Sequence, residues 1–145
     1  MSSQSIAADL GLDRRKLPDL SDAHTRQKLS RGAVEAALRI AQKWDLGNQD
    51  ARSLLGGVSH GRFHDLKKSH KGVLTYDELT RVSLLIGIFK ALNILFSEEL
   101  ANAWVSRPNS NPMFNNATPL SSLIEGGIPR MLEVRRLLDS RRGGR

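Results

Sequence analysis

Residues 75–96 read TYDELTRVSLLIGIFKALNILF, and this stretch decides the fold. Thr75 followed three residues later by Glu78 fits a capping box, which predicts that a helix begins here. The rest of the stretch is apolar on nearly every side of such a helix. A helix of this kind is buried in a core or shared between subunits. The residues expected to form the core and a dimer contact are Leu85, Phe89, Leu92 and Phe96.

Other helices are predicted on both sides of this one. Upstream, apolar periodicity and capping residues favour helices over 30–46, 48–55 and 59–68. Downstream, the predicted helices run from 98 to before Pro108, from Pro119 to the glycines at 126 and 127, and from Pro129 onward. No segment has the alternating pattern of a convincing strand. The predicted fold class is therefore all-α.

The composition narrows the classes of protein that fit. The chain has 145 residues, no cysteine and a net charge of +7. The lack of cysteine excludes a disulfide framework, a cysteine nucleophile and a thiolate zinc site. No apolar run reaches the roughly 18 residues of a membrane-spanning helix, and no secretion signal is visible at the N-terminus. We expect a cytoplasmic protein without a cofactor, and the basic balance favours nucleic acid as a partner.

The stretch RSLLGGVSHGRFHDL, residues 52–66, has the features of a helix-turn-helix. Ser53 supplies the small residue at the helix crossing, Gly57 supplies the turn, and Val58, Phe63 and Leu66 supply apolar anchors after it. The second helix can then lie in the DNA major groove. The lysines would contact phosphate, and Arg62 or a histidine could read a base. The residues expected to face DNA are Ser59, His60, Arg62, His64, Lys67 and Lys68.

The histidines of this segment allow another interpretation. His60 and His64 are four residues apart, a spacing that can hold a metal on one face of a helix. No cysteine or evident acidic ligand completes such a site, so we expect no metal. A histidine could also serve as a general base, but no nucleophile lies at a meaningful spacing from it. We therefore expect that the protein is not an enzyme.

The C-terminal half resembles the toxin-binding domain of the Xre/MbcA/ParS antitoxins, which are partners of RES-domain toxins. The resemblance rests on the order and spacing of several motifs. These are RVSLLIGI at 81–88, ANAWVSRPN at 101–109, TPL at 118–120, LIEGG at 123–127 and VRRLLD at 134–139. The upstream helix-turn-helix agrees with the Xre-type layout of the family. A departure lies at 109–117, where family members often place glycine or Phe-Gly.

The resemblance implies a function and a domain plan. RES toxins deplete NAD, and their antitoxins lie over the entrance to the NAD pocket. The C-terminal helix and tail are expected to cover it, through Arg130, Glu133, Arg135, Arg136, Arg141, Arg142 and Arg145. The expected parts are a flexible arm over 1–29, a DNA-binding domain over 30–72, and a toxin-binding and dimerisation domain over 73–145. Trp104 is expected to anchor the core, and operator DNA and a second copy of the chain are the other expected partners.

Two alternatives remain open from the sequence. The chain could be a dimeric helix-turn-helix transcription regulator without a toxin partner, in which case its C-terminal half only dimerises. It could also be a scaffolding or polar-localisation protein, as the names of some relatives suggest. The basic C-terminal tail could likewise be an exposed segment that only adds to the field attracting DNA.

Overall fold

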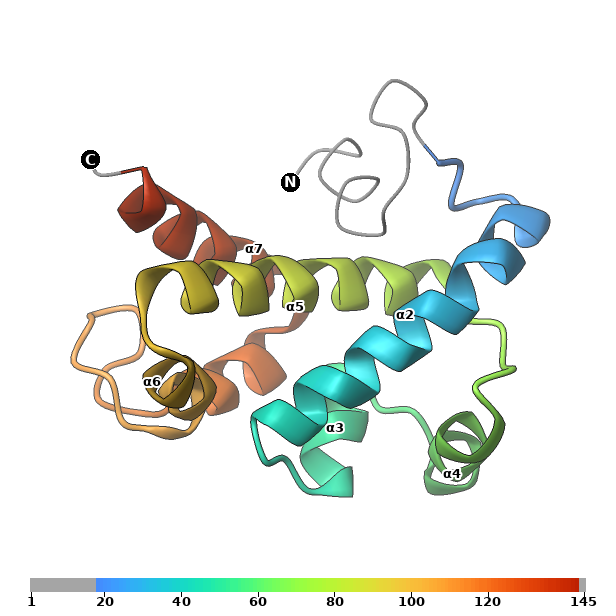
Figure 1. Cartoon of the computed structure of the whole chain (residues 1–145), viewed down its shortest axis with the longest axis horizontal. Coiled ribbons are helices and arrows are strands. Elements are labelled where there is room, and N and C mark those ends of the chain that lie inside the picture. The colour runs from blue at the N-terminus through green and yellow to red at the C-terminus, as the bar shows by residue number, and fades with distance from the viewer. Residues whose placement is uncertain (1–17, 144–145) are drawn as a thin grey trace.

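A computed structural model describes residues 18–143 of the chain, and every regular element within this range is helical (Figure 1). This confirms the predicted all-α class. The helices are α2 (Ala23–Lys43), α3 (Asn48–Leu54), α4 (His60–Ser69), α5 (Tyr76–Leu95), α6 (Glu98–Ala103) and α7 (Pro119–Arg142), with a short 3-10 helix, η1 (Trp104–Ser106), after α6. None of the helices in this range is long and apolar enough to cross a membrane.

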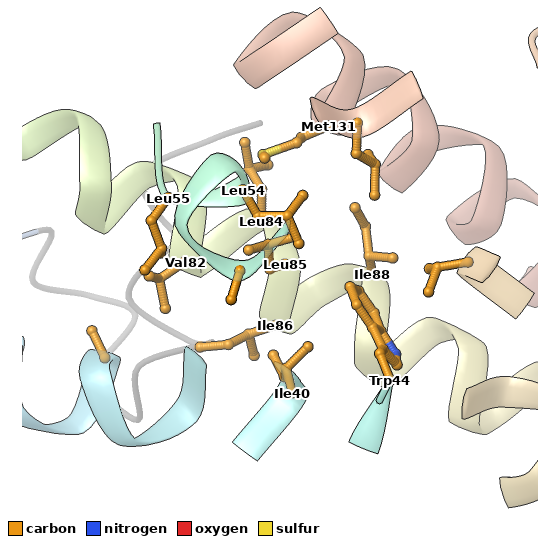
Figure 2. Close-up of a cluster of buried hydrophobic side chains, with 14 of the residues drawn as sticks. Ile40, Trp44, Leu54, Leu55, Val82, Leu84, Leu85, Ile86, Ile88 and Met131 are labelled. Carbon is orange, nitrogen blue, oxygen red and sulfur yellow. The ribbon is translucent and has the colours of Figure 1, made fainter. Parts of the chain in front are cut away.

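Helix α5 is the central element of the fold. It packs most extensively against α7 and α2, and α6 covers its C-terminal part. Figure 2 shows side chains from α2, α3 and α7 converging on α5, among them Ile40, Leu54 and Met131. The chain therefore buries most of its own apolar helix, while Tyr76 and Ile94 near the helix ends stay exposed.

This enclosure corrects part of the prediction for α5. Leu85 and Leu92 are core residues as expected, with exposures of 3% and 0%. They are buried by helices of the same chain, so they are not available to a second subunit. Phe89 and Phe96 are only partly buried, and Phe89 lies beside Trp44 with 6.3 Å between ring centroids.

The N-terminal boundaries of the predicted helices follow from their caps. Thr75 and Glu78 form the predicted capping box: the Glu78 N–H donates to Thr75 Oγ1 at 3.1 Å, and the Thr75 N–H donates to Glu78 Oε1 at 2.9 Å. Ser59 caps α4 and Thr118 caps α7 through the same kind of side-chain acceptor. These caps satisfy backbone N–H groups that have no partner within the helix.

Helix α2 begins earlier than expected. Its cap is Asp22, whose carboxylate accepts a hydrogen bond from the Thr25 N–H at 2.9 Å. Residues 23–29, expected within a flexible arm, are helical, and Leu20 and Leu29 are buried in the core. The prediction undervalued these two leucines because they are widely spaced among polar residues. The remainder of the expected arm, residues 1–17, lies outside the described residues, as does Arg145.

Helix α7 bends at the predicted pair of glycines. Gly127 adopts φ 61° and ψ −149°, a backbone conformation that side chains with a Cβ essentially exclude. Pro129 follows and supports a new helical start, because its fixed φ suits a first helical turn. The bend divides α7 into a short segment and a longer C-terminal segment. The longer segment packs on α5 through Met131, Val134 and Leu138.

Candidate functional site

Helices α3 and α4 form the predicted helix-turn-helix. Gly56 and Gly57, at φ 93° and 88°, turn the chain out of α3, which requires residues that tolerate positive φ. Arg52 Nε donates to the Val58 carbonyl at 2.8 Å and closes the turn. Phe63 and Leu66 are buried beneath α4. The orientation of α4 relative to α3 is therefore held by both the turn and the core.

The outer face of α4 is basic and exposed. Ser59, His60, His64, Lys67 and Lys68 all lie at the surface. Within residues 18–143, no carboxylate forms an ion pair with His60, His64 or Lys68. The same residues contain no group of three or more His, Asp or Glu that could hold a metal ion. This face can therefore present its positive charge to an anionic partner.

Arg62 differs from its neighbours, because its guanidinium is bound within the protein. Nη2 donates to Glu78 Oε1 at 2.8 Å and to the Val73 carbonyl at 3.1 Å, and Nη1 donates to Glu78 Oε2. Arg62 therefore fastens α4 to the start of α5, and its expected contact with DNA stays a prediction. The buried Glu78 carboxylate requires a cationic partner, and Arg62 supplies it.

The protonation of Glu78 reflects these contacts. Burial alone would raise the pKa of its carboxyl, but hydrogen bonds from Arg62 and Thr75 outweigh burial and hold the pKa below its usual value. Glu78 in turn raises the pKa of Arg62. Sequence reasoning assigned Glu78 only to the capping box, and no local pattern links it to a residue so far upstream.

Lys67 also makes contacts within the helix-turn-helix. Its Nζ donates to Asn48 Oδ1 of α3 at 3.1 Å and lies 5.7 Å from the centre of the Phe63 ring. These contacts bring the ammonium group between α3 and α4, whereas Lys68 has no such contact in the described chain. Lys67 and Lys68 therefore have different surroundings, although both were predicted to face DNA.

The arginines of α7 differ in exposure. Three of them are exposed, namely Arg136, Arg141 and Arg142. Arg142 Nη1 lies 3.4 Å from Asp139 Oδ1. Arg130 and Glu133 are neighbours on the same helix, 3.8 Å apart. Glu133 is exposed and Arg130 is half-buried. The outer face of the C-terminal segment is therefore basic, with three exposed arginines against the exposed carboxylates of Glu133 and Asp139.

Arg135 is largely buried against α5, unlike the exposed arginines of this basic face. Its side chain is 14% exposed, and Nε lies 3.4 Å from Asp139 Oδ2. The guanidinium lies directly on Gly87 of α5, because a Cβ at Gly87 would be only 1.8 Å from Arg135 Nη1. Arg135 therefore packs on α5, and its expected contact with the toxin stays a prediction. Its sequence neighbours gave no sign that a glycine of α5 leaves space for it.

Trp104 anchors the loop that leads to α7. Its ring meets Phe114 edge to face, with 5.7 Å between centroids and an interplanar angle of 84°. Phe114 is buried, while Trp104 is half-buried. The Asn109 N–H donates to the Ala117 carbonyl at 3.0 Å, and the Asn116 N–H donates to the Asn109 carbonyl at 3.0 Å. The asparagine-rich loop is therefore closed by its own backbone and held by an aromatic pair.

Each half of the chain is similar to a known protein domain. The antitoxin Xre-like helix-turn-helix domain matches residues 23–87, and the antitoxin Xre/MbcA/ParS C-terminal toxin-binding domain matches residues 91–144. The chain belongs to the Xre/MbcA/ParS family of antitoxins. It is also 39% identical over 112 residues to "uncharacterized protein y4oB" of Sinorhizobium fredii (strain NBRC 101917 / NGR234), an alignment that covers 77% of this chain and 84% of the relative. No solved structure matches the chain.

The two domains of this antitoxin share one helix. Their matched regions meet between residues 87 and 91, within α5, and no flexible linker separates them. Arg81 of α5 lies near this junction, and its Nε donates to Asp77 Oδ2 of the same helix at 2.7 Å. A Cβ at Gly56 would lie 3.0 Å from Arg81 Nε, and one at Gly127 would lie 3.6 Å from Arg81 Nη2. The turn of the helix-turn-helix and the bend of α7 therefore lie close to the same side chain.

Proposed function

We propose that this antitoxin binds and neutralises a RES-domain toxin that depletes NAD, and that it represses its own operon through α4. The observation that carries the proposal is the match of residues 91–144 to a toxin-binding domain whose last helix presents a basic outer face. Arginine forks bind carboxylates through paired hydrogen bonds, which suits the acidic groups of a cleft that handles NAD.

The anchoring of α7 supports a rigid mode of inhibition. Met131, Val134 and Leu138 are fully buried against the body, so the helix keeps its orientation when a partner arrives. Figure 1 shows the last turns of α7 at the edge of the molecule. We propose that Arg136, Arg141 and Arg142 meet the rim of the toxin pocket. A preformed helix loses little conformational entropy on binding, which favours tight association.

The test is co-expression with the product of the neighbouring gene, which this proposal expects to be a RES-domain toxin. The antitoxin is expected to restore growth and the cellular NAD level, and to copurify with the toxin in a complex of defined mass. A chain that binds its own promoter region, yet neither copurifies with the toxin nor restores growth, would instead be the regulator without a toxin partner.

For repression, we propose that the exposed face of α4 enters the major groove of operator DNA. On this proposal the exposed His60 and His64 contact base edges, and the exposed Lys68 contacts phosphate. Two copies would bind half-sites about one DNA turn apart, roughly 34 Å. Because Leu85 and Leu92 are enclosed, the second copy would contact other, exposed residues. Footprinting of the promoter with the purified antitoxin, alone and with toxin, tests this mode of repression.

A further inference from the structure

The helix-turn-helix contains a cavity of about 300 Å³ between α2, α3 and α4. Its inner wall is apolar and is formed by Leu38, Ala41, Leu46, Ala51 and Phe63. The same five residues also border a smaller void of about 20 Å³. The small side chains of Ala41 and Ala51 leave room along the wall of this cavity, which opens to solvent at its rim.

The outer rim of this cavity is polar and carries hydrogen-bond donors. Gln42, Asn48 and Lys67 line it, and all three are exposed. None of the residues that line the cavity is acidic. The Lys67 ammonium donates to Asn48 Oδ1 at 3.1 Å, and no ion pair of Lys67 with a carboxylate is found in residues 18–143. The rim therefore offers an uncompensated positive charge beside an apolar wall.

We propose that this cavity binds a small carboxylic acid with a hydrocarbon body. The carboxylate would accept hydrogen bonds from Lys67 Nζ and the Gln42 or Asn48 amide, and the hydrocarbon would replace the empty space beside Phe63. An apolar pocket with a few convergent polar groups is the usual form of a small-molecule site, and its volume lies at the lower end of the usual range of roughly 300–1,000 Å³. The site lies in the DNA-binding half and does not depend on the toxin.

The experiment uses the full-length chain, labelled with nitrogen-15, and octanoate as the probe. Octanoate is expected to shift the amide resonances of residues around the cavity and to give nuclear Overhauser contacts to the Phe63 ring and the Leu38 methyl groups. Octanamide, which lacks the charge, is expected to bind about tenfold more weakly, because it cannot accept a charge-assisted hydrogen bond. Absence of nuclear Overhauser contacts to Phe63 and Leu38 would overturn the proposal.

Variants separate the cavity from general surface binding. Lys67→Met removes the charge and keeps the length of the side chain, and Ala41→Leu fills the space; each is expected to weaken octanoate binding by at least about tenfold. Lys68→Met removes the same charge from the neighbouring lysine, which does not line the cavity, and is expected to leave binding unchanged. Equal binding by the wild-type chain and Lys67→Met would contradict the site. If Ala41→Leu fails to fold, the nuclear Overhauser contacts measured on the wild-type chain still decide the question.

Discussion

Arg62 of α4 binds the Glu78 carboxylate of α5 through both terminal nitrogens. Glu78 is 7% exposed and also caps α5, so one carboxylate joins the start of α5 to α4. Further along α5, Gly87 lies against Arg135 of α7. Helix α5 is therefore joined both to α4 of the helix-turn-helix and to the C-terminal segment of α7.

Replacing Arg62 with alanine is expected to destabilise the fold by about 2 kcal/mol, because it leaves the buried Glu78 carboxylate without its cation. The estimate stays below that for a fully buried pair, since the Arg62 side chain is 36% exposed. Urea denaturation measures the change. Arg39→Ala, which removes an exposed arginine of α2, serves as the control and is expected to change stability by less than about 0.5 kcal/mol. Loss of operator binding by Arg62→Ala at unchanged stability would instead make Arg62 a DNA contact.

Local patterns in the sequence predicted much of this fold. The capping box at Thr75, the glycine turn after α3 and the break of α7 at Gly127 depend on neighbouring residues, and the structure confirms each of them. Pairs between distant residues left no such signal. Arg62 was predicted only as a DNA contact, because Glu78, the residue that it binds, had already been assigned to the capping box. Leu85 and Leu92 are likewise buried because α2 and α7 pack on α5, and the apolar pattern of α5 alone does not reveal this packing.

The stability of the antitoxin is expected to fall in acid through Glu78. The folded-state pKa of this carboxyl is lower than its ordinary value of 4.5, so its stabilisation is fully present above pH 4.5. It is lost progressively as the pH falls through the folded-state pKa, because the folded protein must then take up a proton. Urea denaturation of the wild type and Glu78→Gln across this range tests the assignment. The variant is expected to be less stable at neutral pH and to lose less stability on acidification; parallel curves would contradict it.

Lys68→Ala is expected to weaken operator binding without changing stability, because Lys68 is exposed and makes no ion pair in the described chain. If it contacts a phosphate, the slope of log K against log salt should fall by about 1. Lys28→Ala removes an equal charge from the exposed face of α2 and is the matched control. Binding measured by fluorescence anisotropy at several salt concentrations distinguishes the two. If the slope of log K against log salt is the same for both variants, Lys68 is not the phosphate contact and the DNA binds another surface.

Gly87→Ala is expected to disturb the packing of α7 on α5. A Cβ at this position would lie 1.8 Å from Arg135 Nη1 and 2.1 Å from Cζ, so the guanidinium must move out of a largely enclosed site. Overpacking of this kind costs about 1–3 kcal/mol, partly offset by the better helix propensity of alanine. Adding Arg135→Ala removes the clash and is expected to recover part of the thermal stability. No recovery in the double variant would show that Gly87 matters for another reason.

The triple variant Arg136→Ala, Arg141→Ala and Arg142→Ala is expected to lose toxin neutralisation while keeping its fold and its DNA binding. The three side chains are exposed on the outer face of α7, whereas the buried face that holds the helix on α5 is unchanged. Each hydrogen bond from a charged group at a binding rim contributes about 1.5–3 kcal/mol, so the affinity for the toxin should fall by at least about a hundredfold. Growth rescue at matched expression and calorimetry with an inactive toxin measure the effect. A control that removes the same charge from α2, at Lys28, Arg31 and Arg39, should still neutralise. If both triple variants fail equally, general charge and not this face of α7 attracts the toxin; if neither fails, the toxin contacts another surface.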